Sequence, residues 1–309
     1  MRIAVTGASG FVGGAVCRAL AAGGATVLAY GRRPAVDPAH VGGAPYRSWD
    51  ITRGPLADAP AADAVVHCAG SVTDWGQAAA LFAANLTGTR NVLASFPGAR
   101  FVHVSTASVY DPFRPSVMVT EDEAPVRRYL NAYGASKAAA ERAVLAAPGT
   151  IVLRPHAVYG PGDTTLLPRV LSAVRGPFLV AAGTGRQRIS LTSIANLVQA
   201  CVLAATGPVS SGVFNVADAD PVTLDDALRE ILRERGVRAR PVYAPAAAAR
   251  PLAALAEGAF LLARRPEPPR LTRYAISHLA VERTLDISAA REVLGYEPLP
   301  TTFAGAAAW

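Results

Sequence analysis

The chain has few cysteines, no long apolar run and no concentrated charge, and each absence excludes a class of protein. Only three of its 309 residues are cysteines, Cys17, Cys68 and Cys201, and they are far apart without metal-binding spacing. No run approaches the ~20 uninterrupted apolar residues of a transmembrane helix, although 51% of the residues are hydrophobic. We therefore expect no disulfide framework, no metal centre and no stable membrane insertion, and we predict a cytoplasmic protein.

The basic residues also lack any concentration. The net charge of +7 comes from arginines spread along the chain, without the clusters or interleaved aromatic residues of a nucleic-acid site. The first strand-like segment begins at Arg2, so no signal peptide is expected before it. These features predict no nucleic-acid partner and a positive balance that suits a polyanionic cofactor.

A glycine-rich segment near the N-terminus is the first positive signal. Arg2–Thr6 has the mostly apolar pattern of a buried strand, and Phe11–Ala22 has apolar residues at helical spacing. Three glycines therefore lie where a strand turns into a helix, the arrangement that binds a dinucleotide pyrophosphate at a helix N-terminus. The alternative is a glycine-rich turn without a ligand. The predicted phosphate-binding residues are Gly7, Ser9, Gly10, Phe11, Val12 and Gly13.

The next strand-like segment, residues 25–30, bears on the choice of cofactor. An NAD-binding domain places a carboxylate at the end of this strand, but here Arg32 and Arg33 follow and the first carboxylate is Asp37. Two guanidinium groups suit a ribose 2′-phosphate by charge and by bidentate geometry. We predict NADP(H) in preference to NAD(H); the alternative is that both arginines are solvated loop charges.

Two further segments predict cofactor contacts. Asp50 and Ile51 end another strand-like segment, and we expect them to contact the adenine. Residues 65–70 predict a strand that runs into a loop under the nicotinamide ring, with Cys68, Ala69 and Gly70 in that loop.

The chemical half of the site is predicted from a Thr, a Tyr and a Lys. Thr106 follows a strand predicted at residues 101–104, and a helix predicted at residues 129–145 places Tyr133 and Lys137 one turn apart. A free Tyr has a pKa near ~10, and a nearby ammonium favours the phenolate and lowers that pKa. We therefore expect Tyr133 to exchange a proton with a substrate oxygen held by Thr106. The alternative is a surface pair without chemistry.

The alternation of strands and helices predicts an α/β fold with a Rossmann-type doubly wound parallel sheet. It continues to about Arg154 and then breaks into Pro- and Gly-rich loops with interspersed helices, one of which is expected to begin near Thr223. We predict a cofactor domain at residues 1–154 and a smaller substrate-binding lobe at residues 155–309.

Several motifs make the chain resemble the extended short-chain dehydrogenases/reductases, the superfamily of nucleotide-sugar epimerases and 3β-hydroxysteroid dehydrogenases. The motifs are residues 6–13, 65–69, 85–92, 104–110 and 153–163 and the Tyr133/Lys137 pair. The resemblance implies that Thr106, Tyr133 and Lys137 form a catalytic trio and that Lys137 also reaches the nicotinamide ribose. It implies that Asn85 supports the loop around the cofactor, that residues 213–216 rejoin the main sheet and that the chain forms a homodimer through its 77–93 and 133–145 helices.

The resemblance also places the substrate site. Pro155 and His156 should lie beside the nicotinamide, and His156 either touches substrate or has a structural role. Nucleotide-sugar enzymes of the family have an Arg-Asp pair where this chain has Ile189 and Ser190, and Arg188 is one residue away. The remaining details favour the hydroxysteroid dehydrogenase-like and ketoreductase branch. The expected substrate-binding residues are Ser71, Asp74, Trp75, Thr106, Ala107, His156 and Arg188.

We therefore predict an NADP(H)-dependent ketoreductase or alcohol dehydrogenase that acts on a small, rather apolar keto or hydroxy compound. The alternatives are a nucleotide-sugar epimerase, dehydratase or 4-ketoreductase, and a regulatory protein that binds the cofactor without turnover. The intact trio argues against the regulatory protein, since a sensor needs no proton donor.

A final segment, residues 252–262, has an amphipathic pattern. Leu252, Leu255, Ala256, Ala259 and Leu262 share one helical face. We expect this face to pack on the protein core. The alternative is binding at a membrane interface, which the flanking residues Arg250, Arg264 and Arg265 would permit.

Overall fold

A seven-stranded parallel sheet forms the centre of the molecule, in a computed structural model that describes residues 1–263, 265, 267–269 and 272–309. Arg264 therefore lies outside the described residues. The strand order is β13-β7-β5-β4-β1-β2-β3, and every neighbouring pair is parallel. The strands are β1 (Arg2–Thr6), β2 (Thr26–Gly31), β3 (Tyr46–Ser48), β4 (Ala64–His67), β5 (Arg100–Val104), β7 (Thr150–Pro155) and β13 (Gly212–Val216).

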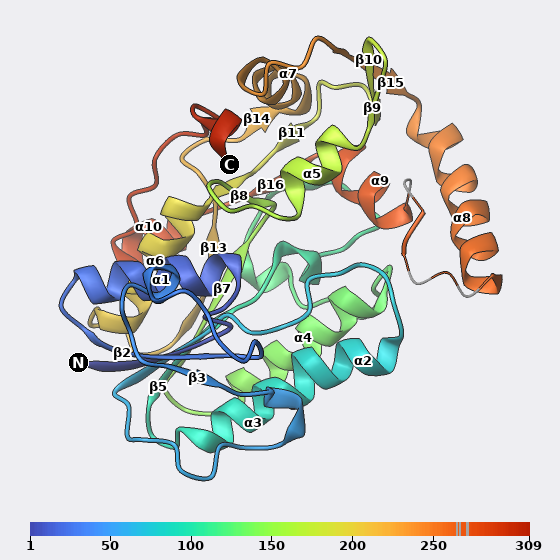
Figure 1. The fold of residues 1–309 in the computed structure, drawn as a ribbon. Helices are drawn as coiled ribbons and strands as arrows, with labels where there is room; N and C mark the ends of the chain where they lie inside the picture. Colours follow the sequence, from blue (N-terminus) through green and yellow to red (C-terminus); the bar gives the residue numbers. More distant parts are fainter. Residues whose placement is uncertain (264, 266, 270–271) are drawn as a thin grey trace.

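Helices cover both faces of this sheet, which makes the fold doubly wound (Figure 1). One layer contains α1 (Phe11–Ala22), α6 (Ile194–Thr206) and α10 (Ser288–Leu294). The other contains α2 (Ala78–Phe82), the π-helix η3 (Ala83–Thr87), α3 (Gly88–Ser95) and α4 (Ala132–Leu145).

Alternating side chains of the central strands belong to the apolar cores on the two faces of the sheet. Ile3 and Val5 belong to the core under α1 and α6, whereas Ala4 belongs to the core under α3 and α4. A strand buried on both faces needs an apolar side chain at each position, which explains the uninterrupted run that predicted it. The bounds of β1 and α1 are those predicted from the sequence.

Two predicted boundaries are wrong. The helix predicted from residue 129 begins at Ala132, because the Asn131 side chain accepts a hydrogen bond from the Gly134 amide at 3.1 Å and caps it. Asp50 and Ile51 do not end a strand: β3 stops at Ser48, and Asp50 caps a short 3₁₀ helix, η2 (Ile51–Arg53), by accepting from the Thr52 amide. Short polar side chains thus set both boundaries.

The second half of the chain is divided between the main sheet and a smaller lobe. β13, α6 and α10 return to the main sheet, as expected for residues 213–216, and β7 continues one residue past the predicted boundary at residue 154. The lobe has its own apolar core and three small sheets. Its helices are α5 (Leu166–Leu171), α7 (Leu224–Glu234), α8 (Ala246–Leu262) and α9 (Arg273–Leu279).

The lobe's strands are short. They are β6 (Ser116–Val119), β8 (Val158–Tyr159), β9 (Val174–Arg175), β10 (Phe178–Ala182), β11 (Arg188–Ile189), β12 (Thr192–Ser193), β14 (Val222–Thr223), β15 (Arg240–Ala244) and β16 (Arg283–Leu285). The helix predicted near Thr223 is confirmed: the Thr223 side chain accepts from the Asp226 amide at 3.1 Å and caps α7.

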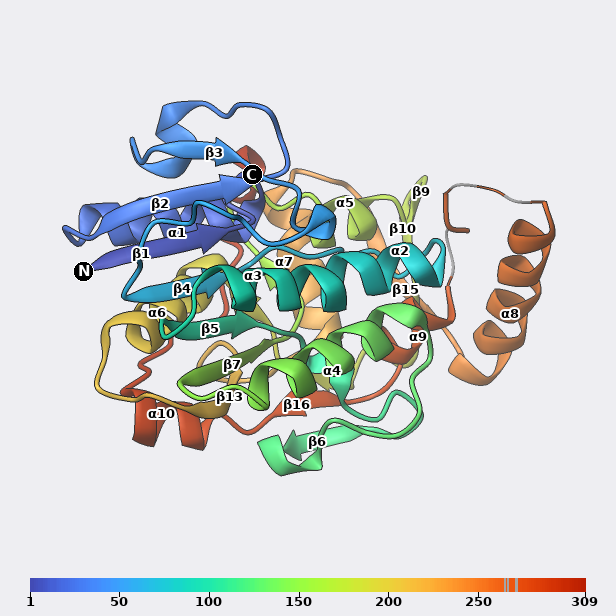
Figure 2. The ribbon, with the colours of Figure 1, turned by 90° about the horizontal axis from the view of Figure 1, so that it is seen from below.

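The expectation that the apolar face of residues 252–262 packs on the core is wrong. Leu252, Leu255 and Leu262 are 62%, 72% and 89% exposed, and the buried side chains of α8 are Ala249, Ala253 and Glu257. Figures 1 and 2 both show α8 at the edge of the molecule. None of the helices in the described part of the chain is long and apolar enough to span a membrane.

Candidate active site

The glycine-rich loop is closed by contacts that only glycine permits. Gly7 has a φ of 73°, and a Cβ on Gly13 would lie 2.2 Å from the Gly7 carbonyl oxygen. Gly10 is the N-cap of α1 and offers no side-chain acceptor to the helix. The amides of the first turn, including those of Phe11 and Val12, therefore have no carbonyl partner inside the helix and are available for an anion.

The two predicted 2′-phosphate ligands lie at the end of β2 and are exposed. Arg33 is held through its backbone, since the Tyr46 hydroxyl donates to its carbonyl oxygen at 2.7 Å. Arg32 is close enough to Asp50 to contribute to the lowered pKa of that carboxyl, which arises chiefly from hydrogen bonds with Thr52. The Arg32 guanidinium therefore lies near Asp50.

Asn85 ties the loop after β4 to α4, the helix that carries Tyr133. Its Oδ1 accepts from the Ser71 amide at 2.7 Å, and its Nδ2 donates to the Ser136 hydroxyl at 2.9 Å. Ser136 in turn donates to the carbonyl of Tyr133. Gly70 lies so close that a Cβ there would be 2.8 Å from the Asn85 Oδ1. The geometry gives Asn85 the supporting position that the resemblance implied.

Thr106, Tyr133 and Lys137 are brought together and buried. Burial raises the pKa of Tyr133, and its side-chain hydrogen bond with Thr106 opposes this only in part. The Lys137 ammonium donates to the Val104 carbonyl at 2.7 Å and to Nε2 of His103 at 3.3 Å. The predicted lowering of the Tyr133 pKa by Lys137 is not observed, because the ammonium is directed to these acceptors instead. Burial lowers the pKa of Lys137 to about 8.

Two stacked histidines under Lys137 were not anticipated from the sequence. His67 and His103 are register partners on β4 and β5, with ring centroids 5.3 Å apart. His67 bonds Thr6 and Thr89 through its two ring nitrogens, at 2.6 and 2.9 Å. Burial holds the pKa of His67 near 3 and that of His103 well below its usual range, so both are neutral beside the ammonium. Each His stands three residues after the first residue of its strand, and this was the only signal in the sequence.

A line of hydroxyl groups extends from the trio toward the lobe. Thr106 Oγ1 donates to Ser108 Oγ at 3.2 Å, and Ser108 Oγ lies 2.9 Å from the Tyr274 hydroxyl. The Tyr274 ring meets the Tyr133 ring edge-on, with centroids 6.2 Å apart. Neither Ser108 nor Tyr274 was predicted from the sequence. Tyr274 could not be, because α9 packs over the trio although it lies more than a hundred residues further along the chain.

Asp74 joins the loop after β4 to the lobe. Its carboxylate forms an ion pair with Arg169 of α5 at 2.7 Å and accepts from the Thr272 hydroxyl, the N-cap of α9, at 3.1 Å. Trp75 Nε1 donates to the Arg265 carbonyl at 3.3 Å. Asp74, a predicted substrate residue, therefore connects the loop to α5 and α9, and Trp75, another one, connects it to the chain that follows α8.

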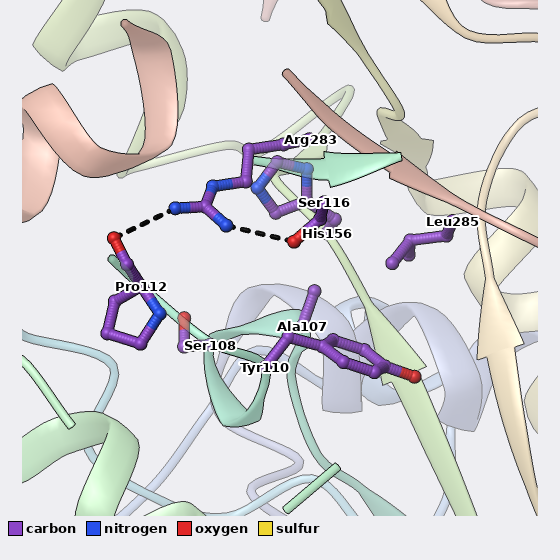
Figure 3. Close-up of a pocket in the computed structure, with 8 residues that line it drawn as sticks. All are labelled: Ala107, Ser108, Tyr110, Pro112, Ser116, His156, Arg283 and Leu285. Atoms are coloured by element: carbon purple, nitrogen blue, oxygen red, sulfur yellow. Dashed lines mark hydrogen bonds between the residues drawn. The ribbon is translucent and has the colours of Figure 1, made fainter. Parts of the chain in front are cut away.

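A small pocket lies beside the hydroxyl line, and Figure 3 shows Arg283 and His156 facing Ala107 and Ser108 across it. Its volume is about 20 Å³, and it is also lined by Tyr110, Pro112, Ser116 and Leu285. His156, which follows Pro155 at the end of β7, donates from Nδ1 to the Ser190 carbonyl at 2.6 Å, and burial lowers its pKa to about 4. His156 is thus a neutral wall of this pocket.

Arg188 is not brought to this group of residues. Its side chain is exposed and donates to the Pro221 carbonyl at 3.2 Å. Ile189 and Ser190 are buried, and Ser190 uses its hydroxyl to accept from the Leu285 amide at 3.0 Å. Among the residues that the structure describes, no group of three His, Cys, Asp or Glu side chains could hold a metal ion.

The comparisons with known proteins agree with this geometry. Residues 3–217 match the model of the NAD dependent epimerase/dehydratase family. The chain is 34% identical to a 4-hydroxy-2-methyl-3-oxo-4-farnesyl-3,4-dihydroquinoline-1-oxide ketoreductase of Stigmatella aurantiaca, over 96% of this chain and 92% of that protein. It is 30% identical to a 2-alkyl-3-oxoalkanoate reductase of Shewanella oneidensis, over 96% and 82%. Among solved structures, "MoeE5 in complex with UDP-glucuronic acid and NAD" has a TM-score of 0.72 and 26% identity, over 96% and 94%.

Proposed function

Since the chain belongs to the NAD dependent epimerase/dehydratase family, we propose that it is an NAD(P)H-dependent ketoreductase with Tyr133 as the proton donor. One observation carries this proposal: Thr106 and Tyr133 share a hydrogen bond at the sheet edge that also bears the glycine-rich loop, next to the buried Lys137. In open α/β sheets, ligands bind at the carboxyl ends of the strands. The relatives reduce 3-oxo compounds, as their names state.

Each residue of the trio has its own role in the proposed reaction. The nicotinamide, when bound, supplies hydride to the carbonyl carbon. Thr106 donates a hydrogen bond to the carbonyl oxygen and holds it against Tyr133, whose hydroxyl gives up its proton as negative charge develops on that oxygen. Lys137, whose ammonium is held by the Val104 carbonyl and His103, is mostly protonated at neutral pH because its pKa is about 8, and it contributes positive charge near the resulting phenolate. Oxidation of an alcohol uses the same groups in reverse.

The proposed cofactor is NADP(H), bound by the glycine-rich loop with its 2′-phosphate at Arg32 and Arg33. The exposed position of both guanidinium groups at the end of β2 supports this preference. An Arg32→Ala, Arg33→Ala double variant should weaken NADPH binding roughly 10²- to 10⁴-fold, since each of the two lost charged hydrogen bonds costs ~1.5–3 kcal/mol, and should leave NADH binding nearly unchanged. Titration of tryptophan fluorescence with each cofactor measures this. Equal losses for the two cofactors would refute the assignment.

The alternative is an enzyme of nucleotide sugars, as in the solved neighbour with UDP-glucuronic acid. The position of Arg188, which is exposed and bonded to Pro221, does not support a diphosphate ligand there. We propose a keto substrate rather than a nucleotide sugar for this reason. We also propose a homodimer through the helices at residues 77–93 and 133–145, a prediction that rests on the family alone.

The test of the proposed function is a Tyr133→Phe variant assayed by NADPH oxidation with 3-oxo compounds, polycyclic ketones and keto-sugar nucleotides. The variant should keep its affinity for cofactor and lose activity by ~10²–10⁴-fold, the usual contribution of a general acid. Tyr243→Phe is the matched control, since that hydroxyl bonds Asp225 in the lobe. Near-full activity of Tyr133→Phe would mean that the proton comes from another group.

A further inference from the structure

Arg283 is a buried cation whose hydrogen-bond partners are all neutral. It is 6% exposed, and its guanidinium donates at 2.8–3.0 Å to four backbone carbonyls and one hydroxyl. The acceptors are the carbonyl oxygens of Asp111, Pro112, Arg114 and Ser277 and the Ser116 hydroxyl. Figure 3 shows two of these bonds, to Pro112 and Ser116. None of these acceptors carries a formal charge, and among the described residues Nη2, which has two N–H groups, donates only to the Pro112 carbonyl.

No carboxylate among the described residues forms an ion pair with Arg283. The Asp111 carboxylate is near, but it accepts from the Phe113 amide at 2.8 Å instead. Burial lowers the pKa of Arg283 to about 10, so the group is still protonated at neutral pH. A buried charge without a counter-ion is costly, and an anion placed beside it would recover part of that cost.

The pocket next to Arg283 has room for an atom of such an anion. Its volume of about 20 Å³ fits roughly one water-sized group, which is also the size of one carboxylate oxygen. Ser108, a second buried polar side chain, lines it with Arg283. The pocket is adjacent to the proposed reaction centre, because Ser108 bonds Thr106 directly.

We propose that this pocket is a carboxylate subsite and that the substrate is the anion of a 3-oxo acid. The ketone oxygen lies at Thr106 and Tyr133, and one carboxylate oxygen enters the pocket against Arg283. This inference rests on the proposed ketoreductase function and names the substrate class. Ser108 bonds Thr106 at 3.2 Å and lines the pocket, so the two binding points are adjacent, and a 3-oxo acid has its ketone and its carboxylate on either side of one carbon atom. Phosphate, with three terminal oxygens, fits a pocket of this size less well.

The first test uses the unmodified enzyme with NADPH and three compounds that share the same alkyl tail. They are a freshly saponified long-chain 3-oxo acid, its methyl ester, and the methyl ketone that remains after decarboxylation. The acid should have a kcat/KM roughly 10- to 100-fold above both neutral compounds, the scale of one charged hydrogen bond. Equal values for the acid and the ester would overturn the subsite while leaving the ketoreductase function in place. Turnover of none of these ketones, with activity on nucleotide sugars alone, would overturn the proposed function itself.

The second test places a carboxylate side chain of the protein itself next to Arg283. Ser116 lies 2.9 Å from the guanidinium, so Ser116→Asp supplies an internal counter-ion and should bring the acid-to-ester ratio of kcat/KM to one or below. Ser116→Ala is the matched control: it removes one neutral acceptor but leaves the charge uncompensated, so the ratio should stay within about threefold of wild type. An unchanged ratio in folded Ser116→Asp would refute the subsite. If that variant does not fold, the substrate comparison on the unmodified enzyme decides by itself.

Discussion

Among the residues that the structure describes, the two deeply buried arginines lie in opposite surroundings. Arg154, next to the cofactor half, pairs with the Glu141 carboxylate at 2.8 Å, and both side chains are almost fully buried. Burial lowers its pKa, but the hydrogen bond and charge of Glu141 outweigh that effect and the pKa is raised. Arg283, in the lobe, has only neutral acceptors, and its pKa is lowered. Arg154 thus has a counter-ion within the chain, whereas we propose that Arg283 receives its counter-ion from a ligand.

Two helices show the same contrast. The buried side of α1 packs Val16, Cys17 and Leu20 into the main core, and its glycines touch neighbouring backbone. The buried side of α8 offers chiefly alanines, while its leucines are exposed. Arg154 and the buried side of α1 are therefore covered within the cofactor half, whereas the described part of the lobe carries a charge and an apolar surface that its own residues do not cover.

Removing the charge of Glu141 should have the largest effect on stability. Glu141→Gln leaves Arg154 as an uncompensated buried charge and weakens the acceptor of Ser105, so we expect a loss of ~3–5 kcal/mol in the free energy of unfolding. Urea denaturation measures the loss, with Glu292→Gln on the surface as the control. A loss below ~1 kcal/mol would mean that neutral acceptors suffice for Arg154 as well, and the contrast with Arg283 would disappear.

Adding one methyl group should have opposite effects on stability in the two helices. Gly13→Ala in α1 puts a Cβ 2.2 Å from the Gly7 carbonyl and should cost ~1–3 kcal/mol of stability, together with most of the cofactor affinity. Gly258→Ala in α8 meets no atom within 4 Å and should stabilise by ~0.5–1 kcal/mol, the helix preference of Ala over Gly. Thermal unfolding with and without NADPH compares them. Equal changes in the two variants would contradict the difference in packing.

Truncating a leucine of α8 should have the smallest effect. Leu255 is 72% exposed, so Leu255→Ala should change the free energy of unfolding by no more than ~0.5 kcal/mol. Leu20→Ala in α1, where the side chain is 2% exposed, should cost ~2–5 kcal/mol. Chemical denaturation of both variants provides the comparison. A large loss for Leu255→Ala would show that its face is covered in solution.

Much of the cofactor half could be predicted, because its signals are local. The apolar run of β1, the helical spacing of α1 and the glycines between them are neighbours in sequence, and the predicted bounds of both elements are correct. The spacing of Tyr133 and Lys137 likewise follows from one helical turn. The exceptions are Asp50 and Asn131, where a single hydrogen bond to the backbone decided the boundary.

The sequence by itself thus determined the parallel sheet, the glycine-rich loop and the trio, since periodicity and spacing act within one element. Only the tertiary structure decided which way Lys137 points, since its acceptors lie on another element, and which face of α8 is covered, since that helix is apolar on both sides. It also brought Tyr274 and Arg283 next to Ser108 from segments far apart in the chain. Such contacts depend on how elements pack, and no pattern within an element records them.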